Sequence, residues 1–241
     1  MNRPSRSSLA IALAASGGFA AICPADFIGY VFDTYVVNVS GVDHFVCDIY
    51  GQFDDPLDTV TSVFNANIST VTGSAFHHND FETLAGGPGT WGIWATANLP
   101  QLGLVPTNDS FVMIGGPFSP GAANTTSLEG VFDPPTAPMP PANCGWFNAE
   151  PSNLQGRVAP ETLRTQIGRF VLESFSSGPI MTFAANLAYD QGPGTDIRYA
   201  WDGGQGSGPT TTIALIPTPA AVTVLLALSI GARRDRRRGR N

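Results

Sequence analysis

Residues 179–189 read PIMTFAANLAY, and this stretch decides the class of fold. Its apolar side chains recur at every second position: Met181, Phe183, Ala185, Leu187 and Tyr189. The polar Thr182 and Asn186 fall between them. Successive side chains of a β-strand point to opposite faces, so this spacing gives one apolar face and one more polar face. The stretch therefore predicts a strand that covers a hydrophobic core.

The same period of two recurs in both directions along the chain. Residues 44–53 and 196–202 alternate clearly, and shorter runs rich in Val, Ile, Phe and Thr lie at 27–39, 59–64, 91–97, 110–115 and 165–175. Turn-forming clusters of Gly, Pro and Asp separate these runs. We predict an all-β fold, an antiparallel β-sandwich or jelly roll of about eight strands. The single segment with helical character is 159–166.

The composition supports one folded body of this kind. The 241 residues include 27 Gly and 20 Pro, and only 13% are charged, which argues against a coiled coil or a helical bundle. The 43% hydrophobic fraction argues equally against disorder. Only four arginines and 18 acidic residues fall in residues 26–216, so that part carries a net charge near −14. Such a surface repels nucleic acid and attracts cations.

The N-terminal residues 1–25 have the pattern of a secretory signal peptide. Arg3 and Arg6 precede an uncharged run of 13 residues, 9–21, which is too short for a permanent membrane span. Small residues stand just before a possible cleavage site after Ala25, and an extended run begins directly after it, at Asp26. We therefore expect cleavage after Ala25. The alternative is a buried N-terminal helix.

The C-terminal residues 217–241 carry a second pattern. Pro217 and Pro219 keep the chain from entering a helix early, and the apolar residues 220–232 follow them. As a helix these 13 residues rise about 20 Å, short of a hydrocarbon core of about 30 Å. Adding residues 213–216 or extending the arginine side chains would close that gap. The positive-inside rule places the arginine cluster in the cytoplasm; the cluster comprises Arg233, Arg234, Arg236, Arg237, Arg238 and Arg240.

This ending resembles the PEP-CTERM sorting signal of bacterial exported proteins, which combines a Pro-x-Pro motif, a short apolar helix and terminal arginines. The family's motif is typically Pro-Glu-Pro, and Thr218 stands here in place of the Glu. The resemblance implies the secretion machinery and an exosortase-like processing enzyme as partners. It also implies a transient stay in the inner membrane, then delivery to the cell surface or extracellular matrix. The alternative is an ordinary tail anchor that is not processed.

Two cysteines remain in the exported part, residues 26–216, once the signal peptide is removed. Cys47 and Cys144 can form one disulfide in an oxidising compartment, where closing so long a loop stabilises the fold by about 4–5 kcal/mol. The alternative is two buried free thiols that never meet. Neither cysteine has the spacing of a zinc site.

The sequence offers few groups for a metal or cofactor, and we expect none. His77 and His78 point to opposite faces if they lie in a strand, so a third ligand would have to come from a distant segment. We therefore interpret them as polar loop residues. Residues 54–58 and 190–202 carry carboxylates in turns, and a calcium site in one of them is the alternative.

No catalytic signature is present in the sequence, and we predict no catalytic residue. A carboxylate pair such as Glu129 and Glu173 is one arbitrary choice among many. We expect a non-catalytic surface or matrix protein of structural or adhesive role. The first alternative is a carbohydrate-binding module that recognises exopolysaccharide, and the second is a secreted hydrolase. Stacking on sugars would use Trp91, Trp94, Trp146 or Trp201, although at least one of the first two belongs to the core.

Overall fold

The computed structural model describes residues 27–77, 91–92, 109–115, 124–132, 137–173, 175, 178–200 and 210–214. The segments expected to be a signal peptide, residues 1–25, and a sorting signal, residues 217–241, lie outside these residues. In the described part, strands dominate, with one 3-10 helix, η1 (Pro151–Asn153). The same part contains no helix with the length and apolar character that a membrane span requires.

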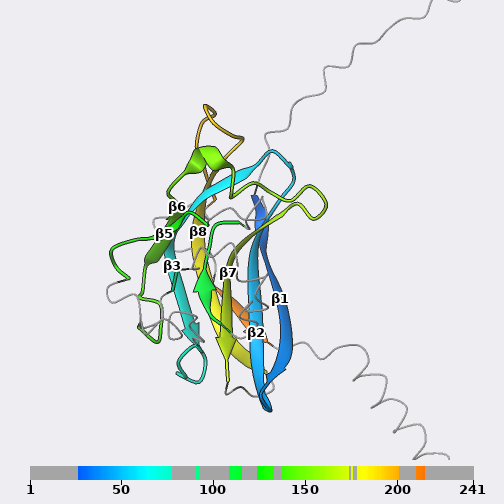
Figure 1. Cartoon of the computed structure of the whole chain (residues 1–241), viewed down its shortest axis with the longest axis vertical. Helices are drawn as coiled ribbons and strands as arrows, with labels where there is room; N and C mark the ends of the chain where they lie inside the picture. Colours follow the sequence, from blue (N-terminus) through cyan, green and yellow to red (C-terminus); the bar gives the residue numbers. More distant parts are fainter. Residues whose placement is uncertain are drawn as a thin grey trace, which may run out of the picture.

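The strands form two antiparallel sheets that lie as two layers (Figure 1). The four-stranded sheet has the order β1 (Phe27–Val39), β2 (Val42–Phe53), β7 (Arg164–Leu172) and β4 (Phe111–Val112). The larger sheet has the order β10 (Thr211–Ala214), β8 (Pro179–Asp190), β3 (Thr59–Thr70), β6 (Cys144–Asn148) and β5 (Thr126–Leu128), and β9 (Arg198–Ala200) also pairs with β8. The prediction of an all-β, antiparallel fold is confirmed.

One hydrophobic core lies between the two sheets. Alternate residues of β8, such as Met181, Phe183 and Leu187, are fully buried in it, as the period of two predicts. Rings from the two sheets meet edge to face: Tyr30 and Phe183 have ring centroids 5.0 Å apart. The Tyr30 hydroxyl also donates a hydrogen bond of 2.6 Å to the Ala185 carbonyl. The sheets are therefore joined by apolar burial and by directional contacts.

Several elements differ from the sequence-based expectation. β3 continues to Thr70, past Asn65, whose φ of 51° lies in the left-handed region. Strands β5, β6 and β10 were not predicted. The helix expected at 159–166 is wrong: a single turn, closed by the Leu163 amide on the Ala159 carbonyl, leads directly into β7. Ile213 is buried in β10, so residues 213–214 belong to the sheet and do not lengthen the C-terminal apolar segment.

The two cysteines are buried free thiols, which corrects the expected disulfide. Cys47 lies on β2 and Cys144 on β6, in different sheets. Burial raises the pKa of both thiols, that of Cys144 to about 12. The Cys144 thiol donates to the Ala66 carbonyl at 3.6 Å. The alternative stated for the sequence, two buried thiols, is the arrangement in the structure.

Candidate metal centre

Three polar side chains meet at one end of the outer face of the four-stranded sheet. On β2, His44 lies on the same face as Val46 and Asp48, opposite to the core residues Phe45 and Cys47. The β2–β7 register pairs Val46 with Val171 and Phe45 with Leu172. Continuing that register places His44 opposite Glu173, the residue that follows β7. The period of two then directs both side chains to the outer face.

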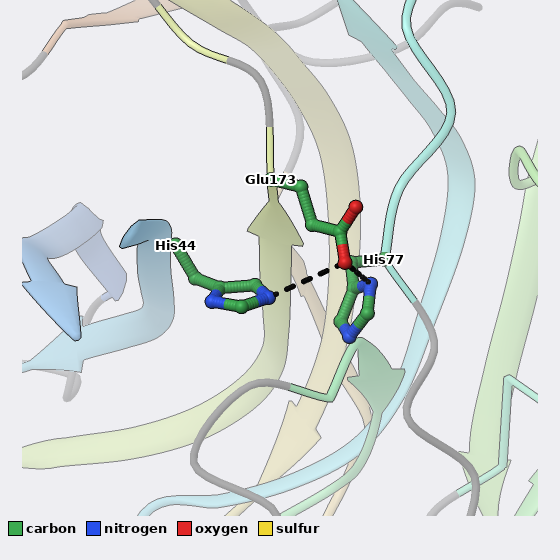
Figure 2. Close-up of side chains that lie close together, drawn as sticks. All are labelled: His44, His77 and Glu173. Atoms are coloured by element: carbon green, nitrogen blue, oxygen red, sulfur yellow. Dashed lines mark ion pairs between the residues drawn. The ribbon is translucent and has the colours of Figure 1, made fainter. Parts of the chain in front are cut away.

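His77 reaches the same place from a segment that follows β3. Its backbone amide donates a hydrogen bond of 2.7 Å to the Val171 carbonyl, and its carbonyl accepts one of 3.1 Å from Ser110. These bonds hold His77 beside β7, on the side away from β2. Glu173 therefore lies between the two histidines, as Figure 2 shows.

The carboxylate of Glu173 contacts both rings. Its Oε1 atom is 2.9 Å from His77 Nδ1 and 3.5 Å from His44 Nε2. The two imidazole centroids are 4.8 Å apart. The exposed fraction of the side chains increases across the cluster, from 2% for His44 to 22% for His77 and 53% for Glu173. The cluster thus has a buried end at His44 and an open end at Glu173.

The hydrogen bond at the far side of the His44 ring fixes its neutral tautomer. Nδ1 is 3.1 Å from the Val42 carbonyl, which can only accept, so Nδ1 carries the proton. In the neutral ring, the other nitrogen, Nε2, presents a lone pair. It is buried and has no hydrogen-bond partner. Because this buried Nε2 faces a carboxylate oxygen, two electron-rich atoms lie opposite each other.

His77 has a different environment. Burial lowers its pKa, the neighbouring His44 acts in the same direction, and the Glu173 carboxylate opposes both effects. A lowered pKa favours the neutral ring, which can donate one hydrogen bond to Glu173 through Nδ1. The cluster therefore offers two imidazoles and one carboxylate, with one ligand atom of each lying within 4.8 Å of the others.

Among the described residues, this is the one group of three or more His, Cys, Asp or Glu side chains close enough to hold a metal ion. Imidazole nitrogen with carboxylate oxygen is a donor set that suits zinc and other first-row transition ions. A histidine whose second nitrogen donates to a backbone carbonyl is also the usual arrangement around such ions. The sequence pattern does not bring these three residues together, and it predicts His77 as a polar loop residue.

The acidic turns considered for calcium have local roles. The Asp55 carboxylate accepts a 2.8 Å hydrogen bond from the Leu57 amide, and the Asp190 carboxylate accepts one of 2.8 Å from Gly192. Both are turns closed by an Asp side chain. Glu129 and Glu173, the arbitrary carboxylate pair, follow strands of different sheets, β5 and β7.

The tryptophans are divided between the core and the undescribed segments. Trp91 and Trp146 are fully buried, and their indole N–H groups donate to the carbonyls of Ala137 and Met113. The expectation that Trp91 or Trp94 belongs to the core is confirmed by Trp91. Trp94, Trp201 and His78 lie outside the described residues.

Comparison with known proteins gave no match, whether to a family model, a curated protein or a solved structure.

Proposed function

We propose that this chain is a non-catalytic protein of the cell surface or extracellular matrix, with a structural or adhesive role. The observation that carries the proposal is the pairing of a signal-peptide pattern at one end with the PEP-CTERM-like ending at the other. An exosortase-like enzyme would process the ending after a transient stay in the inner membrane. The body is then a β-sandwich released outside the cell.

The properties of the body support this proposal. Its net charge near −14 keeps it away from nucleic acid and anionic lipid and attracts cations. The buried side chain of Gln155, between η1 and β7, joins separate segments of the fold. Its amide donates to the Ile114 carbonyl at 2.6 Å and accepts from the Thr125 amide at 2.7 Å. A rigid, acidic body with long strands suits a structural component of a matrix.

A test of the proposal removes the charge at the C-terminal end. Replacing the six arginines of residues 233–240 with Gln abolishes the positive-inside bias. We expect the variant to be lost from the surface, measured as a several-fold lower fraction digested when intact cells are treated with protease. The matched control replaces Arg157 and Arg198, two arginines of the folded body, and should keep the wild-type fraction. Equal surface digestion of the tail variant and wild type would contradict the proposal.

A second candidate, carbohydrate binding, is favoured by aromatic side chains on the outer face of the larger sheet. Tyr199 is 52% exposed and Phe147 is 40% exposed. The register pairs Tyr199 with Ala188, Ala188 with Ser62, and Ser62 with Phe147, so small residues separate the two rings along one row. Phe64 meets Tyr199 edge to face at 6.1 Å.

A glycan array distinguishes this candidate from a purely structural role. If the body binds polysaccharide through this row, the double variant Tyr199→Ala with Phe147→Ala should lose at least tenfold in signal. Tyr35→Ala, a change of another exposed aromatic on β1 in the other sheet, serves as the control. Absence of binding by the wild-type protein would leave the structural role as the better account.

A further inference from the structure

We propose that His44, His77 and Glu173 bind a divalent first-row transition-metal ion, of which Zn²⁺ is the best match. The inference goes beyond the proposed function, because it depends only on the geometry of the folded body. It does not require that the chain be exported or that it act at a surface.

The strongest reason to propose a metal ion is the environment of His44 at the buried end of the cluster. Nε2 of His44 is enclosed, has no hydrogen-bond partner and points at the Glu173 carboxylate 3.5 Å away. A buried acceptor without a donor loses its hydration without compensation, and here a second acceptor faces it. A cation between the two atoms turns this repulsion into two favourable bonds. The Val42 carbonyl meanwhile holds the ring by Nδ1, so the lone pair stays directed at the site.

The distances suit a small tetrahedral ion. Bonds of about 2.1 Å in tetrahedral geometry place ligand atoms about 3.4 Å apart. The separation of His44 Nε2 and Glu173 Oε1 is 3.5 Å, and that of His77 Nδ1 and Oε1 is 2.9 Å. The second pair needs only a small opening, because the ion takes the place of the proton on Nδ1, and Nε2 of the same ring carries the proton instead. Glu173 follows a strand end and is half exposed, so its side chain can make that adjustment.

The donor set decides the class of ion. Ca²⁺ and Mg²⁺ take oxygen ligands, which two imidazoles do not supply. Two nitrogens and one carboxylate oxygen suit Zn²⁺ and its neighbours in the first transition row. Because the Glu173 end is open to solvent, a water molecule can complete four-coordination.

Binding at this place would connect three separate segments of the chain. His44 is near the start of β2, Glu173 follows the end of β7, and His77 lies in the segment after β3. An ion held by all three joins the end of the β2–β7 ladder to that segment. Since the ion binds the folded state and the unfolded chain holds no preformed site, it stabilises the fold.

The test is a titration of the purified full chain, freed of metal by chelator, with Zn²⁺ and with Co²⁺. We expect one Zn²⁺ per chain by calorimetry, and a rise in the melting temperature on adding Zn²⁺. With Co²⁺ we expect the strong visible absorption of a tetrahedral site.

The decisive variant is Glu173→Gln, because its side chain is half exposed and the change keeps its shape. Zn²⁺ affinity should fall by more than about 100-fold, since loss of an outer partner alone costs 10–100-fold. His77→Ala should have an effect of the same size. The control Glu129→Gln, a carboxylate of the other sheet, should bind as wild type does. Melting curves without metal show that each variant is folded.

Two results would overturn the inference. One is a wild-type chain that takes up neither ion at stoichiometric concentration, as expected if His44 and Glu173 form only a proton-mediated ion pair. The other is uptake that remains unchanged in Glu173→Gln and His77→Ala, which would place the ion elsewhere.

Discussion

Asp48 and Glu173 are carboxylates on the same outer face, yet their surroundings differ. Asp48 is buried and accepts hydrogen bonds from Arg169, Gln166 and Tyr35, so its oxygens are satisfied. Arg169 also lies over the Phe111 ring at 5.5 Å. Glu173 Oε1 instead lies 2.9 Å from His77 Nδ1 and 3.5 Å from His44 Nε2. The Asp48 oxygens therefore have donors within the protein, whereas His44 Nε2 beside Glu173 has no hydrogen-bond partner.

The Asp48–Arg169 pair should therefore contribute strongly to stability. Arg169→Met leaves a buried carboxylate without its charged partner, and we expect a loss of about 3–5 kcal/mol in the free energy of unfolding. Arg164→Met on the same strand breaks a more exposed pair with Asp33, 3.5 Å long, and should cost at most about 1 kcal/mol. Urea unfolding of both variants gives the comparison. Equal losses in the free energy of unfolding would contradict a larger contribution from the Asp48–Arg169 pair.

The two thiols should be unreactive until the protein unfolds. Burial raises the pKa of Cys144 to about 12, so almost no thiolate exists at pH 8, and the pKa of Cys47 is raised as well. We expect iodoacetamide to label neither Cys47 nor Cys144 in the native protein, and to label both thiols in urea without reductant. Peptide mass spectrometry reads the labels. A Cys47–Cys144 cross-linked peptide in urea would instead support a disulfide.

At the scale of elements, the sequence pattern located the long strands and the short strands β4 and β9, and it missed β5, β6 and β10. The sequences of β2 and β8 alternate over many residues, and β1 is a long run rich in β-forming residues, so the positions of all three follow from the sequence. β5 and β10 have only three and four residues, too few to establish a period. β6 is set by its partners, since it lies between β3 and β5 and buries Cys144 and Trp146. Pairing with distant strands leaves no pattern in the sequence of β6 itself.

The backbones at Gly156 and Val60 approach so closely that position 156 should tolerate no side chain. A Cβ atom on Gly156 would lie 1.8 Å from the Val60 carbonyl oxygen, and the Val60 amide is already bonded to the Gly156 carbonyl at 2.9 Å. Gly156→Ala forces the two backbones apart, and we expect a loss of about 3 kcal/mol or more. Gly130→Ala meets open space and should change stability by less than about 1 kcal/mol. Thermal unfolding measures both variants. Similar melting temperatures for Gly156→Ala and Gly130→Ala would contradict the close backbone approach at Gly156.

At the scale of the molecule, the cluster of His44, His77 and Glu173 shows what sequence cannot supply. Two of these residues lie in segments predicted as strands, and alternation places each on the outer face. That they lie opposite each other depends on the β2–β7 register, which is set by strands 120 or so positions apart. His77 joins through backbone bonds of a non-strand segment, for which no periodicity exists. A search for His and Glu on outward positions at strand ends would have found two of the three.

At the scale of the whole chain, the negative charge of residues 26–216 and the patterns at the two chain ends support the proposed export route. On the proposed route, the signal-peptide pattern directs the acidic body through the inner membrane and the arginine-rich ending is processed before release. The metal site does not depend on this route, so either proposal can fail alone.

Mass spectrometry of the native protein, taken separately from cells and from medium, tests the proposed route most directly. We expect a surface or medium form that begins at about Asp26 and ends near the Pro217–Pro219 motif, without residues 220–241. A chain that keeps both ends, residues 1–241, and is found only in the cytoplasm would contradict export and the surface role together.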